Sequence, residues 1–258
     1  MGTILFIHGM GHNHNREYWR SWEKNLQPYL FKKGLDPDQL SFNGIYYYDL
    51  VPQPREGWQK FSAIFKRGVM EQLQQNLHEK LLRVDYIDPF LGRGPLETIV
   101  NLVADNFGDI FSYMLDDQTY QRVNSRFYHT LQKVSAPVTL VAYSLGSMVS
   151  FCALQQRPEL VYQVKHFITL GSPIFWFHKW LASRAVLSQR PTEAHWTNLA
   201  GRMDVACPHL VGYCTCGADS NVQWELEKYN PVKGHLAYFN DPGALAILAS
   251  AIAKHWYQ

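Results

Sequence analysis

The sequence has little cysteine and no recognisable export signal. Four of its 258 residues are cysteines. The first residues, M-G-T-I-L-F-I-H-G, lack the basic segment and the small-residue cleavage site of a signal peptide. Because disulfides are rare in reducing compartments, we expect a cytoplasmic protein without them. Cys152 lies in an apolar stretch and is expected to pack in the core as a small hydrophobic residue.

The sequence also lacks an excess of either charge and any long apolar run. Lysine and arginine total 24 and aspartate and glutamate total 22, a balance that gives no indication of the basic surface typical of nucleic-acid-binding proteins. No apolar run approaches the ~18 residues of a transmembrane helix. Apolar residues make up 47% of the chain and aromatic residues 14%, enough for a large core. We expect one domain over residues 1–258, with no nucleic-acid partner; the sequence does not determine the oligomeric state.

Short apolar runs alternate with amphipathic segments over most of the chain. Strands are expected at residues 3–7, 44–50, 137–142, 164–170, 195–199 and 222–229. Helices are expected at residues 16–33, 117–134, 146–156 and 244–256. This alternation predicts an α/β fold in which helices flank a mostly parallel sheet.

Residues 51–117 interrupt that alternation. They contain helical patterns at 57–84 and 96–115, joined by a proline- and glycine-rich connector. Because so long a connection is usually functional, we expect a helical cap or lid that sets substrate choice. Phe107, Phe111 and Met114 are expected to line an acyl-binding pocket. A purely structural packing helix is the alternative.

The clearest chemical signal follows the apolar run 137–142. The sequence A-Y-S-L-G places Ser144 between two small residues, Ala142 and Gly146, at the start of the helix 146–156. A nucleophile elbow requires small residues at these two positions because the turn from strand to helix is sharp. We therefore predict that Ser144 is a nucleophile. Ser172, in G-S-P, is interpreted as a turn residue.

A second glycine-rich loop follows the strand 3–7. The sequence H-G-M-G resembles the loop that supplies one backbone N–H of an oxyanion hole. The second N–H comes from the residue after the nucleophile. We therefore expect the backbones of Met10 and Leu145 to bind the oxyanion.

The acid and the base of a triad should follow the nucleophile in that order. Asp204 lies just after the strand 195–199 and is the preferred acid, with Asp219 and Asp241 as competitors. His235 precedes the last helix and is the preferred base, expected in a loop. The competing histidines, which fit the chain order less well, are His209 and His255.

These motifs together resemble the α/β-hydrolase superfamily in its lipase- and esterase-like branch, with a distant similarity to DDHD-type lipid hydrolases. The resemblance rests on H-G-M-G, S-L-G-S, I-T-L-G-S-P, W-x-N with D-V-A, and G-H-x-x-Y. It implies Ser144, Asp204 and His235 as the triad. Tyr143 stands where such families often have histidine, and we expect it to contact substrate. The resemblance also implies a reduced sheet, because two strands of the full fold have no room before Thr3.

The expected reaction is hydrolysis of a small-molecule or lipid carboxylic ester through an acyl-enzyme, with no cofactor and no metal. An acyltransferase or a thioesterase on the same triad is one alternative, and a catalytically silent interaction module is another. Two groups have the chemistry of zinc ligands but not the usual spacing. They are His12 with His14, and Cys207 and His209 with Cys214 and Cys216.

Overall fold

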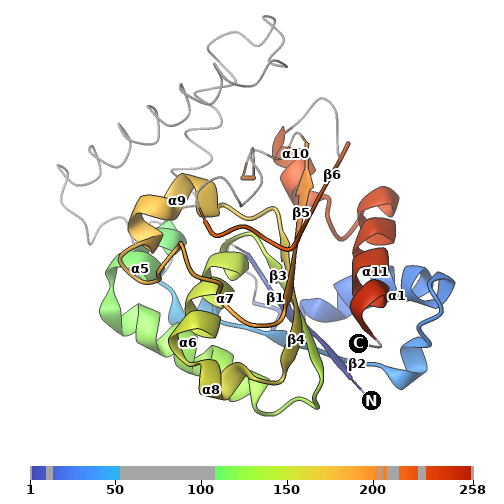
Figure 1. The fold of residues 1–258 in the computed structure, drawn as a ribbon, viewed down its shortest axis with the longest axis horizontal. Coiled ribbons are helices and arrows are strands. Elements are labelled where there is room, and N and C mark those ends of the chain that lie inside the picture. Colours follow the sequence, from blue (N-terminus) through green and yellow to red (C-terminus); the bar gives the residue numbers. More distant parts are fainter. Residues whose placement is uncertain are drawn as a thin grey trace, which may run out of the picture.

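A computed structural model describes residues 2–9, 14–52, 108–202, 204, 206–207, 215–225 and 231–256. Its centre is a six-stranded parallel sheet with the strand order β2-β1-β3-β4-β5-β6 (Figure 1). The strands are β1 (Thr3–Ile7), β2 (Ser41–Ile45), β3 (Val138–Tyr143), β4 (Val164–Leu170), β5 (His195–Gly201) and β6 (Ser220–Trp224).

The central strands are apolar because both faces of the sheet are buried. In β1, Leu5 and Ile7 belong to one core cluster, whereas Ile4 and Phe6 belong to the cluster on the opposite face. Alternate residues of a strand point to opposite faces, so a strand covered on both sides reads as a continuous apolar run. The expected strands at residues 3–7 and 164–170 are confirmed at their predicted bounds.

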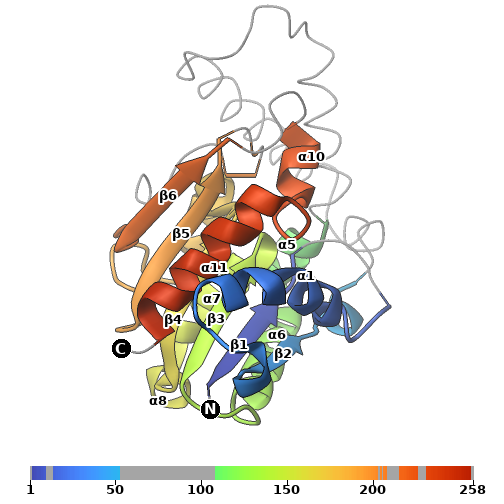
Figure 2. The ribbon, with the colours of Figure 1, turned by 90° about the vertical axis from the view of Figure 1, so that its right-hand side faces the viewer.

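Helices cover the two faces unequally (Figures 1 and 2). On one face lie α1 (Trp19–Lys32) and α11 (Pro242–Trp256). The other face carries α5 (Gly108–Leu115), α6 (Asp117–Leu131), α7 (Leu145–Gln156), α8 (Pro158–Val161) and α9 (Ile174–Leu181). The short helix α10 (Pro231–Leu236) lies beyond the end of the sheet, with the carboxyl end of α11 far from it (Figure 2).

The order of the strands changes direction between β1 and β3. From β1 the chain runs outward to the edge strand β2, then returns beside β1 and continues through β3 and β4 to the opposite edge. In open α/β sheets, ligands bind beyond the carboxyl ends of the strands at such a switch point. The segments expected to carry the nucleophile and the oxyanion loop follow β3 and β1, on the two sides of this point.

Two sequence expectations need correction. The predicted strand 44–50 is wrong: β2 covers Ser41–Ile45, and Tyr48–Leu50 form a 3₁₀ turn, η2. The reason is that β2 pairs with β1 residue by residue from Thr3 to Ile7, so it has no strand to pair with beyond Ile45. The late strand expected at 222–229 is also shifted, because β6 begins at Ser220 and ends at Trp224; residues 226–229 lie outside the described residues.

The expected cap is described only at its end. Residues 53–107, which include Phe107, lie outside the described residues. Phe111 and Met114 are in α5 and belong to the core cluster, where the Phe111 ring contacts Phe177 and Trp180 at centroid distances of 5.8 and 5.5 Å. In α5, therefore, these two side chains pack inside the protein.

Among the described helices, none is long and apolar enough to cross a membrane.

Candidate active site

Ser144 occupies the sharp turn between β3 and α7. Its φ of 53° and ψ of −125° lie in a region that residues other than glycine rarely adopt. Two glycines make room for this turn. A Cβ on Gly146 would lie 2.5 Å from the carbonyl oxygen of His8, and a Cβ on Gly9 would lie 2.5 Å from the Cβ of Ser144. The predicted strand–serine–helix turn is therefore present, and it packs directly against the loop after β1.

Ser144, His235 and Asp204 form one chain of hydrogen bonds. The Oγ of Ser144 lies 3.0 Å from Nε2 of His235. Nδ1 of the same ring lies 2.9 Å from Oδ1 and 3.1 Å from Oδ2 of Asp204. Because the carboxylate can only accept, the proton of the neutral imidazole belongs on Nδ1, and Nε2 is left to accept from the serine hydroxyl. His235 lies in α10 and not in a loop, as the sequence had suggested.

The carboxylate of Asp204 is held by groups that the sequence analysis did not identify. It is fully buried and accepts from the backbone N–H of Ala206 at 2.7 Å and from the hydroxyl of Tyr238 at 2.6 Å. The same hydroxyl accepts from the N–H of Gly201 at 2.9 Å. Burial and the adjacent carboxylate raise the pKa of Tyr238 well above its ordinary value, so this hydroxyl stays protonated and donates.

Gly171 packs against the side chains of both Asp204 and His235. Its φ of 54° is in the left-handed region, and a Cβ there would lie 2.5 Å from Oδ2 of Asp204 and 3.1 Å from Nδ1 of His235. Only glycine satisfies both the conformation and the space at this position. The sequence signal was the glycine that ends the apolar strand 164–170, but its role depends on residues far along the chain.

Tyr143 was expected to contact substrate, and the structure shows its contacts with the base. Its ring stacks on the imidazole of His235 at a centroid distance of 5.1 Å and an interplanar angle of 26°. Its hydroxyl donates to the backbone carbonyl of His235 at 2.6 Å. Tyr143 therefore positions the segment that carries His235.

The loop after β1 is anchored by an aromatic residue of the next strand connection. The hydroxyl of Tyr47 donates to the carbonyls of His8 at 2.8 Å and Gly9 at 3.1 Å, and its ring stacks on the His8 imidazole at 4.0 Å. Met10, the expected donor of one oxyanion N–H, lies outside the described residues. Leu145, the expected second donor, is the first residue of α7, where backbone N–H groups have no carbonyl partner within the helix.

The competing residues occupy other places. Asp219 makes two hydrogen bonds with Arg190, at 2.6 and 2.7 Å, and Asp241 accepts from the N–H of Ala244 at the start of α11. His255 lies near the end of α11. Several residues weighed as bases or metal ligands lie outside the described residues: His12, His209 and Cys214. The expectation for Cys152 is confirmed, since it is fully buried in α7.

In comparisons with known proteins, no family model matches the chain, and no curated protein matches it significantly.

Proposed function

We propose that the protein is a serine hydrolase of the α/β-hydrolase type that cleaves carboxylic esters. The observation that supports this most strongly is the hydrogen-bonded series Ser144–His235–Asp204, in which the serine has a strained backbone. The series lies at the carboxyl ends of parallel strands, beside the point where the strand order reverses. Nucleophile, base and orienting acid are the three roles that acyl transfer requires.

In the proposed reaction, Oγ of Ser144 attacks the ester carbonyl while its proton moves to Nε2 of His235. The carbon–oxygen bond to the alcohol then breaks, and the alcohol leaves with the proton from His235. Water then attacks the acyl carbon and gives a proton to the same nitrogen. The bond between that carbon and Oγ breaks as His235 returns the proton to Oγ, which releases a carboxylic acid and regenerates the Ser144 hydroxyl. Asp204 holds the imidazole in one tautomer and stabilises its cation.

The oxyanion of the tetrahedral intermediate would be bound by the backbone N–H of Leu145, with that of Met10 as the second donor. Removing one preorganised donor of this kind typically costs about 2.7–4 kcal/mol of transition-state stabilisation. The amino-terminal end of α7 adds a favourable dipole, because its first N–H groups point away from the helix body. The proposed substrates are small-molecule or lipid esters.

The direct test is the hydrolysis of p-nitrophenyl acetate and butyrate by the wild type and by Ser144→Ala. We expect the substitution to lower kcat by about 10⁴-fold or more, as removal of a triad serine does. Ser183→Ala is the matched control, because Ser183 is an exposed serine whose hydroxyl donates to the Trp180 carbonyl. Wild-type rates in Ser144→Ala, or no hydrolysis by the wild-type protein, would contradict the proposal.

A further inference from the structure

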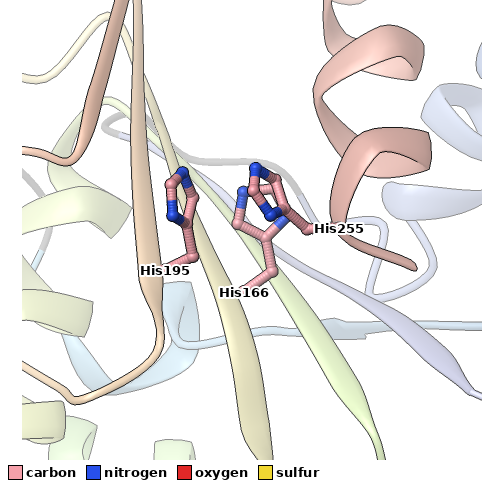
Figure 3. Close-up of side chains that lie close together, drawn as sticks. All are labelled: His166, His195 and His255. Atoms are coloured by element: carbon pink, nitrogen blue, oxygen red, sulfur yellow. The ribbon is translucent and has the colours of Figure 1, made fainter. Parts of the chain in front are cut away.

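Three histidines from three elements meet at the amino ends of β4 and β5 (Figure 3). His166 is in β4, His195 begins β5, and His255 is the penultimate residue of α11. His166 and His195 are register partners on neighbouring strands. One ring nitrogen of each histidine lies within 4.8 Å of the corresponding nitrogens of the other two.

This histidine cluster lies at the opposite end of the sheet from Ser144. The N–H of Ser144 donates to the carbonyl of Leu170, the last residue of β4. A strand rises ~3.3 Å per residue, so the four steps back to His166 separate the cluster from the serine by roughly 13 Å. The cluster therefore plays no part in the proposed triad.

His166 has the arrangement of a metal-binding imidazole. It is only 1% exposed, and its Nε2 lies 2.8 Å from Oγ1 of Thr197. With the Nε2 proton donated to Thr197, Nδ1 carries a bare lone pair, and this buried atom has no hydrogen-bond partner among the described residues. Metal-binding histidines characteristically donate their other ring N–H to a fixed neighbour in this way.

His195 lies next to the carboxylate of Asp219, and carboxylates commonly orient metal-binding histidines. Its Nδ1 lies 3.7 Å from Oδ2 of Asp219, which is itself held by Arg190 and by the N–H of Trp196 at 2.7 Å. An Nδ1 proton directed toward Asp219 leaves Nε2 with the lone pair, and that nitrogen lies at a long distance of 3.3 Å from Oγ of Ser220. A carboxylate next to a ligating histidine raises its basicity and fixes its orientation.

An open cleft gives access to the cluster. Its volume is about 860 Å³, and its lining includes His195 and His255 as well as Lys165, Arg190 and Glu193. A metal bound by three imidazoles keeps a fourth position for water or another small ligand. Lys165 and Arg190 would favour an anion there.

We propose that His166, His195 and His255 bind one zinc ion, with its fourth position facing this cleft. Imidazole nitrogens suit Zn²⁺ and its neighbours in the first transition row, whereas Mg²⁺ and Ca²⁺ require oxygen ligands.

Zinc binding has a structural consequence. The rings of His195 and His255 are stacked at a centroid distance of 3.8 Å and an interplanar angle of 21°. Bonds of about 2.0–2.1 Å to a tetrahedral ion require the nitrogens to lie about 3.3 Å apart, so the two rings must tilt out of the stack. The side chain of His195 is 27% exposed and has room to do so. A bound ion would then join the end of α11 to β4 and β5.

The experiment is calorimetric titration of the full chain with ZnCl₂ after dialysis against a chelator. The wild type should bind one equivalent of zinc, and zinc should raise its melting temperature by several degrees. Substitutions His195→Gln and His255→Gln should each weaken this binding by at least about tenfold and abolish the thermal shift. Both residues are partly exposed, so neither substitution opens a cavity in the core.

His129→Gln is the matched control, because His129 is an exposed histidine on α6. It should bind zinc as the wild type does, and Co²⁺ should give a tetrahedral visible spectrum in both proteins but not in the two cluster variants. Equal zinc binding in all four proteins would place the ion elsewhere and overturn the proposal. Failure of the wild type to bind zinc would overturn it as well.

Discussion

Replacing Gly171 by alanine should impair catalysis without removing any catalytic group. The new Cβ would lie 2.5 Å from Oδ2 of Asp204, whereas ordinary van der Waals contact begins at 3.4 Å. The carboxylate must therefore retreat by about 0.9 Å, and His235 follows because it is hydrogen-bonded to it. A misplacement of about 1 Å in a catalytic constellation can cost ~100-fold in rate, and we expect a loss of that size in kcat/KM.

A second glycine, Gly34, separates the cost of a strained backbone from the effect of displacing the Asp204 carboxylate. Gly34 lies two residues beyond the end of α1 and has a φ of 82°, and a Cβ there would meet nothing within 4 Å. A left-handed alanine costs about 1–2 kcal/mol at either position, which corresponds to a fall of about 2–8 °C in melting temperature. Both variants should therefore be destabilised, but only Gly171→Ala should lose activity.

The assay is p-nitrophenyl butyrate hydrolysis with kcat and KM measured separately, together with a thermal melt of each variant. A Gly171→Ala protein with the wild-type kcat/KM would refute the assigned geometry. An equal loss of activity in Gly34→Ala would attribute the effect to general instability and not to the displaced carboxylate.

Three further outcomes are expected. Asp204→Asn should lower kcat by about 10⁴-fold because the amide has no negative charge and its N–H can donate to Nδ1, which holds His235 in the wrong tautomer, whereas Asp219→Asn should keep the rate; the opposite ranking in the same ester assay would reassign the acid. Phe111→Ala should lower the free energy of unfolding by about 3–5 kcal/mol, since the ring is fully buried against Phe177, and should leave the acyl-chain preference from acetyl to palmitoyl esters unchanged. A changed preference at an unaltered melting temperature would instead support an acyl pocket. Dialysis against a chelator should not alter ester hydrolysis, because the proposed zinc site lies at the far end of the sheet; activity that is lost and then restored by zinc would contradict this.

The nucleophile turn was predictable because its determinants are local. An apolar run, two small residues and a serine stand within the ten positions 137–146 of the chain, and the structure forms the expected turn at Ser144. Asp204 and His235 are distant in sequence from Ser144 and from each other, and were found through the order in which such residues occur along the chain. The structure places His235 within hydrogen-bond distance of both Ser144 and Asp204.

The residues that position the triad were not predictable in the same way. Gly171 and Tyr238 stand in the motifs I-T-L-G-S-P and G-H-x-x-Y, but those motifs do not indicate that both residues contact Asp204, which lies 33 and 34 positions away in the sequence. The expected strand at residues 44–50 was wrong because the tyrosines at 46–48 have a high strand propensity, whereas the length of β1 limits how far β2 can pair. His166 and His195 became neighbours only through the strand register.

The central claim is tested most directly by an active-site label. The folded protein, treated with a fluorophosphonate, should gain the mass of one adduct, and fragmentation should place it on Ser144. The heat-denatured protein and Ser144→Ala should remain unlabelled, because reaction requires the serine together with His235 in the folded arrangement. Labelling of Ser172 or another serine in the folded protein, or no labelling at all, would contradict the proposed catalytic mechanism.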